Sequence, residues 1–146
     1  MDFKLFPKDY VVYIKNAYNR INSAKDYITE LDSVTGDGDH WVNRNMSGIG
    51  GSLGVLYGGA YIAAAKLVHS KEFINISLLN DIFKAEVDSI MSRGKCKPGD
   101  KTMLDSLFTA YTALNDNINN SDIISVLNNV KEQAILGAEN TKDMEA

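Results

Sequence analysis

The sequence has little cysteine and proline and no long apolar run: one cysteine and two prolines occur in 146 residues. The single cysteine, Cys96, excludes an internal disulfide and suits a reducing cytoplasm, where we expect the protein. No apolar run reaches about 18 residues, and the N-terminus has no apolar signal-peptide segment, so we expect no membrane span. The net charge of −4 and the absence of a basic stripe with interleaved aromatics argue against a nucleic-acid partner.

What is present is the composition of an ordinary globular protein, with 45% hydrophobic and 23% charged residues. The length predicts a single domain over residues 1–146 that buries about two-thirds of its unfolded surface. Apolar residues recur at steps of three and four, and no segment shows strand alternation. We therefore predict an all-α fold, an antiparallel bundle of amphipathic helices. The predicted helices run from the turn of Pro7 to about Leu31, over 53–68, over 77–92, after a cap at Asp100, and after a cap at Ser121 or Asp122.

Asp32, Asp37 and Asp39 lie within eight residues and are interleaved with glycines. A like-charge pair at about 4 Å near a surface costs on the order of 4 kcal/mol, which a bound cation relieves. All-carboxylate ligation favours a hard divalent ion such as Mg²⁺, which takes phosphate oxygens as further ligands. The spacing differs from that of the EF-hand calcium loop. A solvated acidic turn that caps a helix is the alternative, and these residues alone leave both interpretations open.

Residues 48–59 contain six glycines in twelve positions. Glycine lets backbone N–H groups approach an anion closely, and a helix N-terminus adds unpaired donors. The segment lacks the Gly-Lys-Ser/Thr ending of a Walker A loop and does not have the spacing of a dinucleotide fingerprint. Close helix packing is the alternative, and we assign it in part to Gly54, Gly58 and Gly59. For residues 48–53 we favour phosphate contact, because a cation site precedes them so closely.

Residues 92–103, SRGKCKPGDKTM, combine a helix end, a turn and a capped helix start. The basic residues suit contact with phosphate or with a partner surface, although a solvated loop fits equally well. Gly94 and Met103 suit the flat apolar wall of an adenine pocket, and a core position is the alternative for the methionine.

Three segments in this order, LDSVTGDGDHWVN, GGSLGVLYG and SRGKCKPGDKTMLD, resemble the nucleotide-binding L subunit of dihydroxyacetone kinase, the DAK2 or Dak-phosphatase-like family. The resemblance implies a helical barrel with a nucleotide at one end, where two Mg²⁺ ions bridge the phosphates of ADP or ATP. Carried over by position, it implies metal ligands at Asp32, Asp37 and Asp39, nucleotide contacts at His40, Trp41 and Asn43, phosphate contacts at Ser52 and Leu53, and the adenine side at Gly94 and Met103. His40 is also a candidate for proton transfer, although a hydrogen-bonding role is favoured.

In function, the resemblance implies the ADP- and Mg²⁺-binding subunit of a dihydroxyacetone (glycerone) kinase, a phosphotransferase. This subunit passes the phosphoryl group to dihydroxyacetone held by another kinase subunit, and a phosphohistidine subunit of the phosphoenolpyruvate phosphotransferase system recharges it. A homodimer or hetero-oligomer is expected. The alternative is a non-catalytic regulatory or adaptor domain on the same scaffold. A fatty-acid kinase nucleotide domain is disfavoured, because that group usually has threonine in place of His40.

The sequence departs from the family pattern in several places. Trp41 replaces a glycine, Leu53 replaces a small hydroxyl residue, and only a few residues separate Asn43 from Gly48, where the family has an additional helix of about 30 residues. The Gly-Arg-rich loop and the Asp-Pro-Gly-like turn that close over the nucleotide in the family are also not found. Either the domain is a shortened homologue without the inter-motif helix and the closing segment, or this sequence omits poorly ordered segments of the full protein. We favour omission, because the join after Met46 and Ser47 is abrupt.

Overall fold

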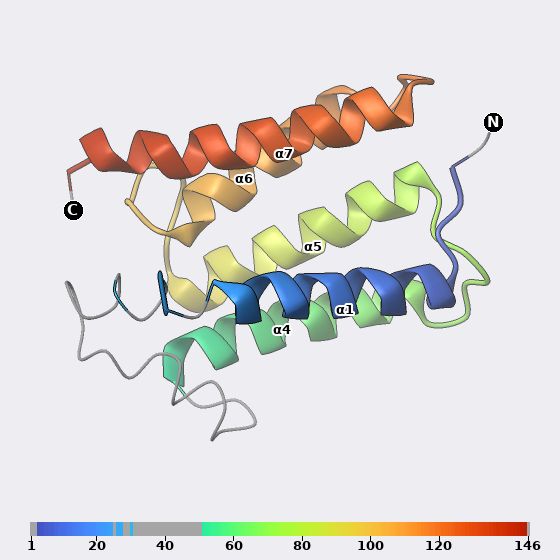
Figure 1. Ribbon diagram of the computed structural model, residues 1–146, viewed down its shortest axis with the longest axis horizontal. Coiled ribbons are helices and arrows are strands. Elements are labelled where there is room, and N and C mark those ends of the chain that lie inside the picture. Colours follow the sequence, from blue (N-terminus) through green and yellow to red (C-terminus); the bar gives the residue numbers. More distant parts are fainter. Residues whose placement is uncertain (1–2, 25, 28–29, 31–50, 146) are drawn as a thin grey trace. The chain divides into compact units, whose positions relative to one another are not determined.

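The computed structural model describes residues 3–24, 26, 27, 30 and 51–145 (Figure 1). These residues form helices joined by turns and contain no multi-residue strand, which confirms the all-α prediction. The chain divides into two compact units, Leu5–Val55 and Met1–Lys4 with Leu56–Ala146. The helices are α1 (Pro7–Ser23), α4 (Gly51–Val68), α5 (Ile76–Gly94), α6 (Met103–Asp116) and α7 (Ile123–Asn140), followed by the 3₁₀ turn η1 (Thr141–Asp143).

Helix α1 begins at Pro7, as predicted, because proline has no N–H to lose in the first turn. The backbone N–H of Phe6 donates to Oδ2 of Asp9 over 3.0 Å, which closes this first turn. The helix ends at Ser23, whose hydroxyl donates to the carbonyl of Arg20 over 2.8 Å. Residues 26, 27 and 30 are again helical, and the predicted helix end near Leu31 lies outside the described residues.

Successive helices from α4 to α7 run antiparallel to each other (Figure 1). Their core contains small and branched apolar side chains from three helices: Ala60 of α4, Val87 and Ile90 of α5, and Leu104 of α6. Aromatic side chains pack against this cluster, with Phe83 and Tyr111 edge to face at a centroid distance of 6.2 Å. The bundle is thus held mainly by apolar burial, as the helical periodicity predicts.

Helices α6 and α7 approach each other closely at Gly137, which is buried. A Cβ at this position would lie 2.7 Å from the carbonyl oxygen of Asp105 and 2.8 Å from Oγ1 of Thr109. Nearby, the hydroxyl of Ser106 donates to the carbonyl of Ala134 over 2.7 Å. A glycine on α7 therefore lets its backbone approach that of α6.

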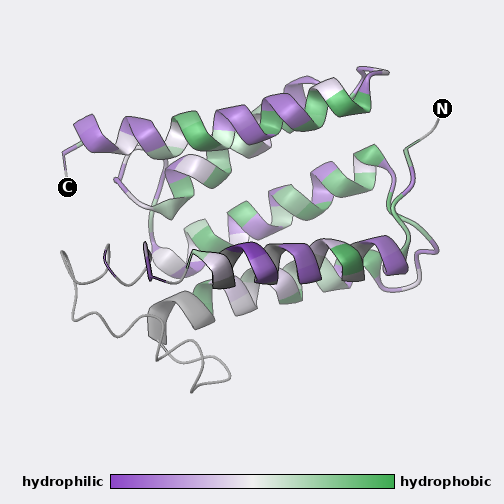
Figure 2. Cartoon of the chain, in the orientation of Figure 1, coloured by the Kyte–Doolittle hydropathy of each residue, from purple (hydrophilic) through white to green (hydrophobic). Residues whose placement is uncertain are grey.

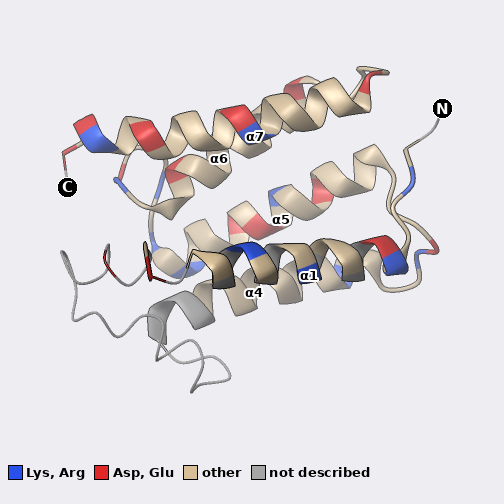
Figure 3. Cartoon of the chain, in the orientation of Figure 1, with Lys and Arg blue, Asp and Glu red and all other residues tan. Residues whose placement is uncertain are grey.

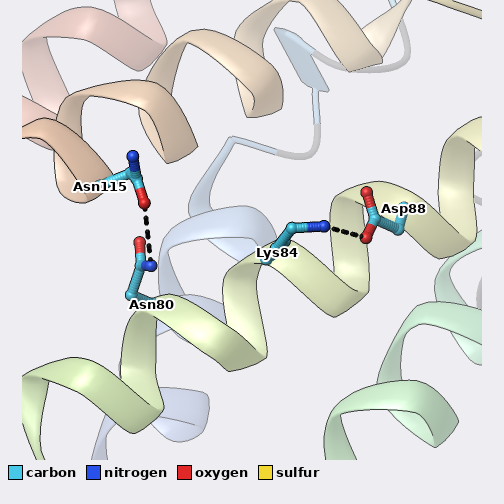
Figure 4. Close-up of polar contacts among 4 residues, drawn as sticks. All are labelled: Asn80, Lys84, Asp88 and Asn115. Atoms are coloured by element: carbon cyan, nitrogen blue, oxygen red, sulfur yellow. Dashed lines mark hydrogen bonds and ion pairs between the residues drawn. The ribbon is translucent and has the colours of Figure 1, made fainter.

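A polar contact joins α5 to the end of α6 (Figure 4). Nδ2 of the buried Asn80 donates to Oδ1 of Asn115 over 3.2 Å, and Oδ1 of Asn80 has no protein partner. On the exposed side of α5, Lys84 and Asp88 form an ion pair of 2.6 Å (Figure 4). Because both side chains are exposed, this pair adds little to stability.

The cap of α6 corrects one sequence prediction. The N-cap is Thr102 and not Asp100, because the Thr102 hydroxyl accepts from the N–H of Leu104 while Asp105 accepts from the N–H of Thr102. These reciprocal bonds form a capping box. Asp100 instead accepts from the N–H of Lys97 over 2.9 Å, inside the preceding turn. The predicted alternative cap at Asp122 is confirmed for α7.

The surface of the bundle is not uniformly polar. In Figure 2, purple and green turns alternate along α7, and Ile124 and Ile135 of this helix are 71% and 54% exposed. Helix α4 has one charged residue, Lys66 (Figure 3). Among the helices that the structure describes, none has the length and apolar content needed to cross a bilayer.

Candidate functional site

The described part of the predicted site lies at helix ends. Ser52 and Leu53 are the second and third residues of α4, Gly94 is the last residue of α5, and Met103 is the first of α6. The other predicted residues lie outside the described part of the chain: Asp32, Asp37, Asp39, His40, Trp41 and Asn43. Their roles stay predictions.

Helix α4 supplies backbone donors at its start. The first four N–H groups of an α-helix have no acceptor within the helix, and those of Ser52 and Leu53 belong to this turn. The positive end of the helix dipole adds to their attraction for an anion. This part of the glycine-rich segment thus has the backbone arrangement that phosphate contact requires.

The end of α5 packs against α4 through Gly94. A Cβ on Gly94 would lie 3.5 Å from Cδ2 of Leu56, which follows Ser52 by one helical turn, and 3.1 Å from Sγ of Cys96. Leu56 of the glycine-rich motif and Gly94 of the basic motif therefore lie close to each other within the unit Leu56–Ala146. Gly94 is exposed and Met103 is half-buried, so both keep surface that a ligand can contact. Gly94 and Met103 stand at the two ends of one connection.

That connection, residues 95–102, is tightly wound. Lys95 adopts the left-handed conformation with φ of 51° and ends α5, while Gly99 and Lys101 have φ values of 97° and 56°. Sγ of Cys96 donates to the carbonyl of Ile90 over 3.9 Å, so the only cysteine packs back on α5. The Cys96 thiol thus has a local structural contact.

Sequence reasoning missed the residue that organises this connection, Asp105. Its side chain is buried, with 4% exposed; Oδ1 accepts from the N–H of Gly99 over 2.5 Å and Oδ2 from the N–H of Thr102 over 2.8 Å. The signal was available, because threonine followed three residues later by an acidic residue is the pattern of a capping box.

Basic residues are frequent on the same connection, which has blue segments in Figure 3. Lys95, Lys97 and Lys101 are exposed, and Lys101 donates from Nζ to the carbonyl of Met144 over 3.0 Å. Arg93, in the last turn of α5, is also exposed. Both open interpretations, contact with an anion and a solvated loop, are compatible with this exposure.

Among the described residues, burial raises the pKa values of two ionisable groups of the bundle. Burial raises the pKa of Glu86 on α5. Burial, together with the nearby Tyr61, raises the pKa of Tyr57 on α4, and the two rings stack at a centroid distance of 6.4 Å. Neither residue belongs to the predicted site, so the shifts concern stability first.

The residue types of the predicted donor set suit both magnesium and phosphate. Three carboxylates are hard oxygen donors and suit Mg²⁺, while unpaired N–H groups at the start of α4 suit phosphate. Among the described residues, which do not include the acidic triad, no group of three acidic, histidine or cysteine side chains is close enough to hold a metal ion. By residue chemistry, the predicted donor set therefore fits a magnesium–nucleotide pair.

Comparison with known families now identifies the class of the protein. The DAK2 domain model matches residues 42–146, and the chain belongs to this family. The match covers four residues of the predicted nucleotide site that the structure describes, Ser52, Leu53, Gly94 and Met103, and also Asn43.

Among curated relatives, the chain is 29% identical over 113 residues to the ADP-binding subunit DhaL of the PEP-dependent dihydroxyacetone kinase of Escherichia coli, covering 58% of this chain and 54% of that protein. It is 27% identical over 152 residues to the corresponding subunit of dihydroxyacetone kinase 2 of Listeria innocua, covering 83% and 70%. It is 36% identical over 99 residues to human triokinase/FMN cyclase, covering 67% of this chain and 17% of that protein.

The chain spans about half the length of the Escherichia coli relative. The alignment with the Listeria innocua subunit extends over 152 positions, more than the 146 residues present here, although it covers 83% of the chain. That relative therefore has residues inside the aligned region that this chain lacks. The alignment length does not locate these residues in the chain.

Proposed function

We propose that this chain is the ADP/ATP- and Mg²⁺-binding subunit of a dihydroxyacetone kinase and carries the phosphoryl-donor nucleotide. The observation that carries the proposal is the contact between Leu56 and Gly94, because it brings the glycine-rich motif on α4 next to the basic motif at the end of α5. The curated names of the bacterial relatives, which describe ADP-binding subunits, support the same role.

Each motif then has one task at the site. Asp32, Asp37 and Asp39 hold two Mg²⁺ ions, and the N–H groups of Ser52 and Leu53 donate to a phosphate. Gly94 and Met103 face the adenine, while His40, Trp41 and Asn43 border the nucleotide. Bound Mg²⁺ neutralises charge on the phosphates.

The chain has no need of a nucleophile of its own for this task. Phosphoryl transfer depends mainly on positioning and on stabilising charge, which backbone donors and carboxylate ligands provide. His40 serves best as a neutral hydrogen-bonding group beside the metal ligands. The acceptor ketose belongs to a second subunit.

This role also implies partner subunits that supply the acceptor and restore the phosphoryl group. We propose a dihydroxyacetone-binding kinase subunit and a phosphohistidine subunit of the phosphoenolpyruvate-dependent phosphotransferase system, in the cytoplasm, with a homodimer or hetero-oligomer as the assembled state. The phosphohistidine subunit restores the phosphoryl group while the nucleotide stays bound.

A coupled phosphorylation assay tests the proposal. The purified full chain, loaded with ADP and Mg²⁺, is mixed with the dihydroxyacetone-binding subunit and the phosphohistidine subunit, and formation of dihydroxyacetone phosphate is followed. Turnover that needs this chain and disappears in Asp39→Ala supports the kinase role. An assay that proceeds equally well without the chain contradicts it.

A regulatory or adaptor role is the second candidate. It is favoured by Trp41 and Leu53, which replace a glycine and a small hydroxyl residue of the family pattern. In that case the chain binds the other kinase subunits in a pull-down but yields no turnover. Robust turnover in the coupled assay eliminates this alternative.

A further inference from the structure

We propose that Asp105 is a positioning residue that sets the adenosine side of the nucleotide site by fixing the connection between α5 and α6. The inference rests on the proposed function, because it concerns how the same site holds its ligand. Asp105 itself touches no proposed ligand group, and it acts through Gly99, Thr102 and Met103.

The carboxylate of Asp105 is committed to this connection with both oxygens. Oδ1 accepts from the N–H of Gly99 and Oδ2 from the N–H of Thr102, at 2.5 Å and 2.8 Å. Asp105 is only 4% exposed, and a buried carboxylate is tolerated only when hydrogen-bond donors such as these satisfy it. It therefore holds two points of the connection, three residues apart, against the first turn of α6.

The connection needs such a tether because its backbone is unfavourable by itself. Lys95 and Lys101 are non-glycine residues with φ of 51° and 56°, a region that side chains with a Cβ rarely adopt. Gly99 has φ of 97°, which glycine permits and which other residues disfavour. Without the bonds from Asp105, the segment between Gly94 and Met103 is free to relax to other conformations.

Asp105 is itself fixed from the opposite side. Its carbonyl oxygen accepts from Oγ1 of Thr109 over 2.6 Å, and it lies 2.7 Å from the Cβ position of Gly137 on α7. The packing of α6 on α7 thus locates Asp105, and Asp105 in turn locates Gly99, Thr102 and the adjoining Met103. The described contacts of Asp105 do not include the start of α4, where phosphate contact is proposed.

Because Asp105 contacts the connection and not the start of α4, its substitution should affect the binding of adenosine more than the binding of phosphate. In Asp105→Asn, one oxygen becomes an NH₂ group that faces an N–H donor, so one bond to the connection is lost. We expect the affinity for ADP with Mg²⁺ to fall about 10-fold, because this is the effect of losing about one hydrogen bond to a charged group. The affinity for inorganic pyrophosphate with Mg²⁺, which has no adenosine, should change less than about twofold.

Isothermal titration of the full chain with ADP and with pyrophosphate, each with Mg²⁺, measures the ratio of the two affinities. One variant serves as a control for stability alone. Asp122→Ala removes the side-chain cap of α7, which lies outside the connection between α5 and α6. It should keep the wild-type ratio of the two affinities. Circular dichroism verifies that every variant is folded.

A second variant keeps the inference testable if Asp105→Asn does not fold. Gly99→Ala has open space for its Cβ but a disfavoured φ, so it should shift the connection and lower the affinity for ADP in the same selective way. If the wild type binds ADP and neither folded variant loses more affinity for ADP than for pyrophosphate, the role of Asp105 is overturned and the proposed function stands. Failure of the wild-type chain to bind ADP overturns both.

Discussion

The side chain of Arg93 lies across the backbone of Gly59, with Cδ and Cζ at 2.6 Å and 2.8 Å from the position that a Cβ of Gly59 would take. Gly59 is buried on α4, and Arg93 belongs to the last turn of α5. A glycine at this position therefore lets the arginine stem pass directly over the neighbouring helix. Its positive charge also complements the negative end of the α5 dipole.

This relationship predicts coupling between the two positions. Alanine in a helix is favoured over glycine by roughly 0.5–1 kcal/mol, but in the wild type the new methyl group must displace Arg93. We expect Gly59→Ala to be more stabilising in an Arg93→Ala background than in the wild type, by at least about 0.5 kcal/mol. Urea unfolding of the four proteins measures this cycle. Equal effects in both backgrounds would contradict the contact.

Alanine substitutions of Gly137 and Gly58 should change the free energy of unfolding in opposite directions. A methyl group on Gly137 collides with the backbone of α6, so we expect Gly137→Ala to lower the free energy of unfolding by about 1–3 kcal/mol. A Cβ on Gly58, inside α4, meets nothing within 4 Å, so Gly58→Ala should raise it by roughly 0.5–1 kcal/mol. Thermal and urea unfolding test both. Loss of stability in Gly58→Ala, or none in Gly137→Ala, is the opposing result.

The helices themselves could be predicted from the sequence because apolar spacing reports one helix face directly. The predicted segments 53–68 and 77–92 compare with α4 at Gly51–Val68 and α5 at Ile76–Gly94. The start of α6 was misplaced because Asp100 and Thr102 are both good caps, and the choice depends on the residue three positions later. Asp105 follows Thr102 at this spacing, whereas Met103 follows Asp100.

Burial was harder to predict than helix formation, since it depends on where the neighbouring helix lies. On α7, Val126 and Gly137 are buried, whereas Ile124 is exposed despite its larger apolar side chain. For the same reason, the hydrogen bonds of Asp105 to Gly99 and Thr102 could not be predicted from the sequence, because they form only when the connection folds. The nucleotide contacts of Gly94 and Met103 stay predictions. The acidic triad stays a prediction.

Glu86 predicts a pH dependence of stability. Burial raises its pKa in the folded chain, so its contribution favours the folded state below the ordinary pKa of glutamate and is lost as the pH rises through the folded value. Glu86→Gln should therefore be more stable than the wild type at pH 7, and this advantage should vanish at about pH 4. Urea unfolding at both pH values provides the measurement.

The control for this experiment is Glu132→Gln, because Glu132 is exposed on α7. Glu132→Gln should show no comparable gain in the free energy of unfolding at pH 7. A Glu86→Gln variant that is less stable than the wild type at neutral pH would mean that the ionised carboxylate makes a favourable contact.

Leu53 predicts a gain of affinity by substitution. If the start of α4 contacts phosphate, Leu53→Thr restores the hydroxyl of the family pattern and adds one hydrogen bond, worth about 0.5–1.5 kcal/mol. Affinity for ADP with Mg²⁺ should rise roughly 2- to 10-fold. Leu53→Val has the same shape as the threonine variant without the hydroxyl and should show no gain. Equal affinities of the two variants count against phosphate contact here.

The most direct test of the central claim is isothermal titration of the full chain with ADP, with and without Mg²⁺. We predict binding that requires Mg²⁺ and is weakened at least 10- to 100-fold in Asp37→Ala, because this variant removes one of the three proposed metal ligands. Asp81→Ala, an exposed aspartate on α5, should bind as the wild type does. Undiminished binding in Asp37→Ala, or no binding by the wild type, would contradict the account.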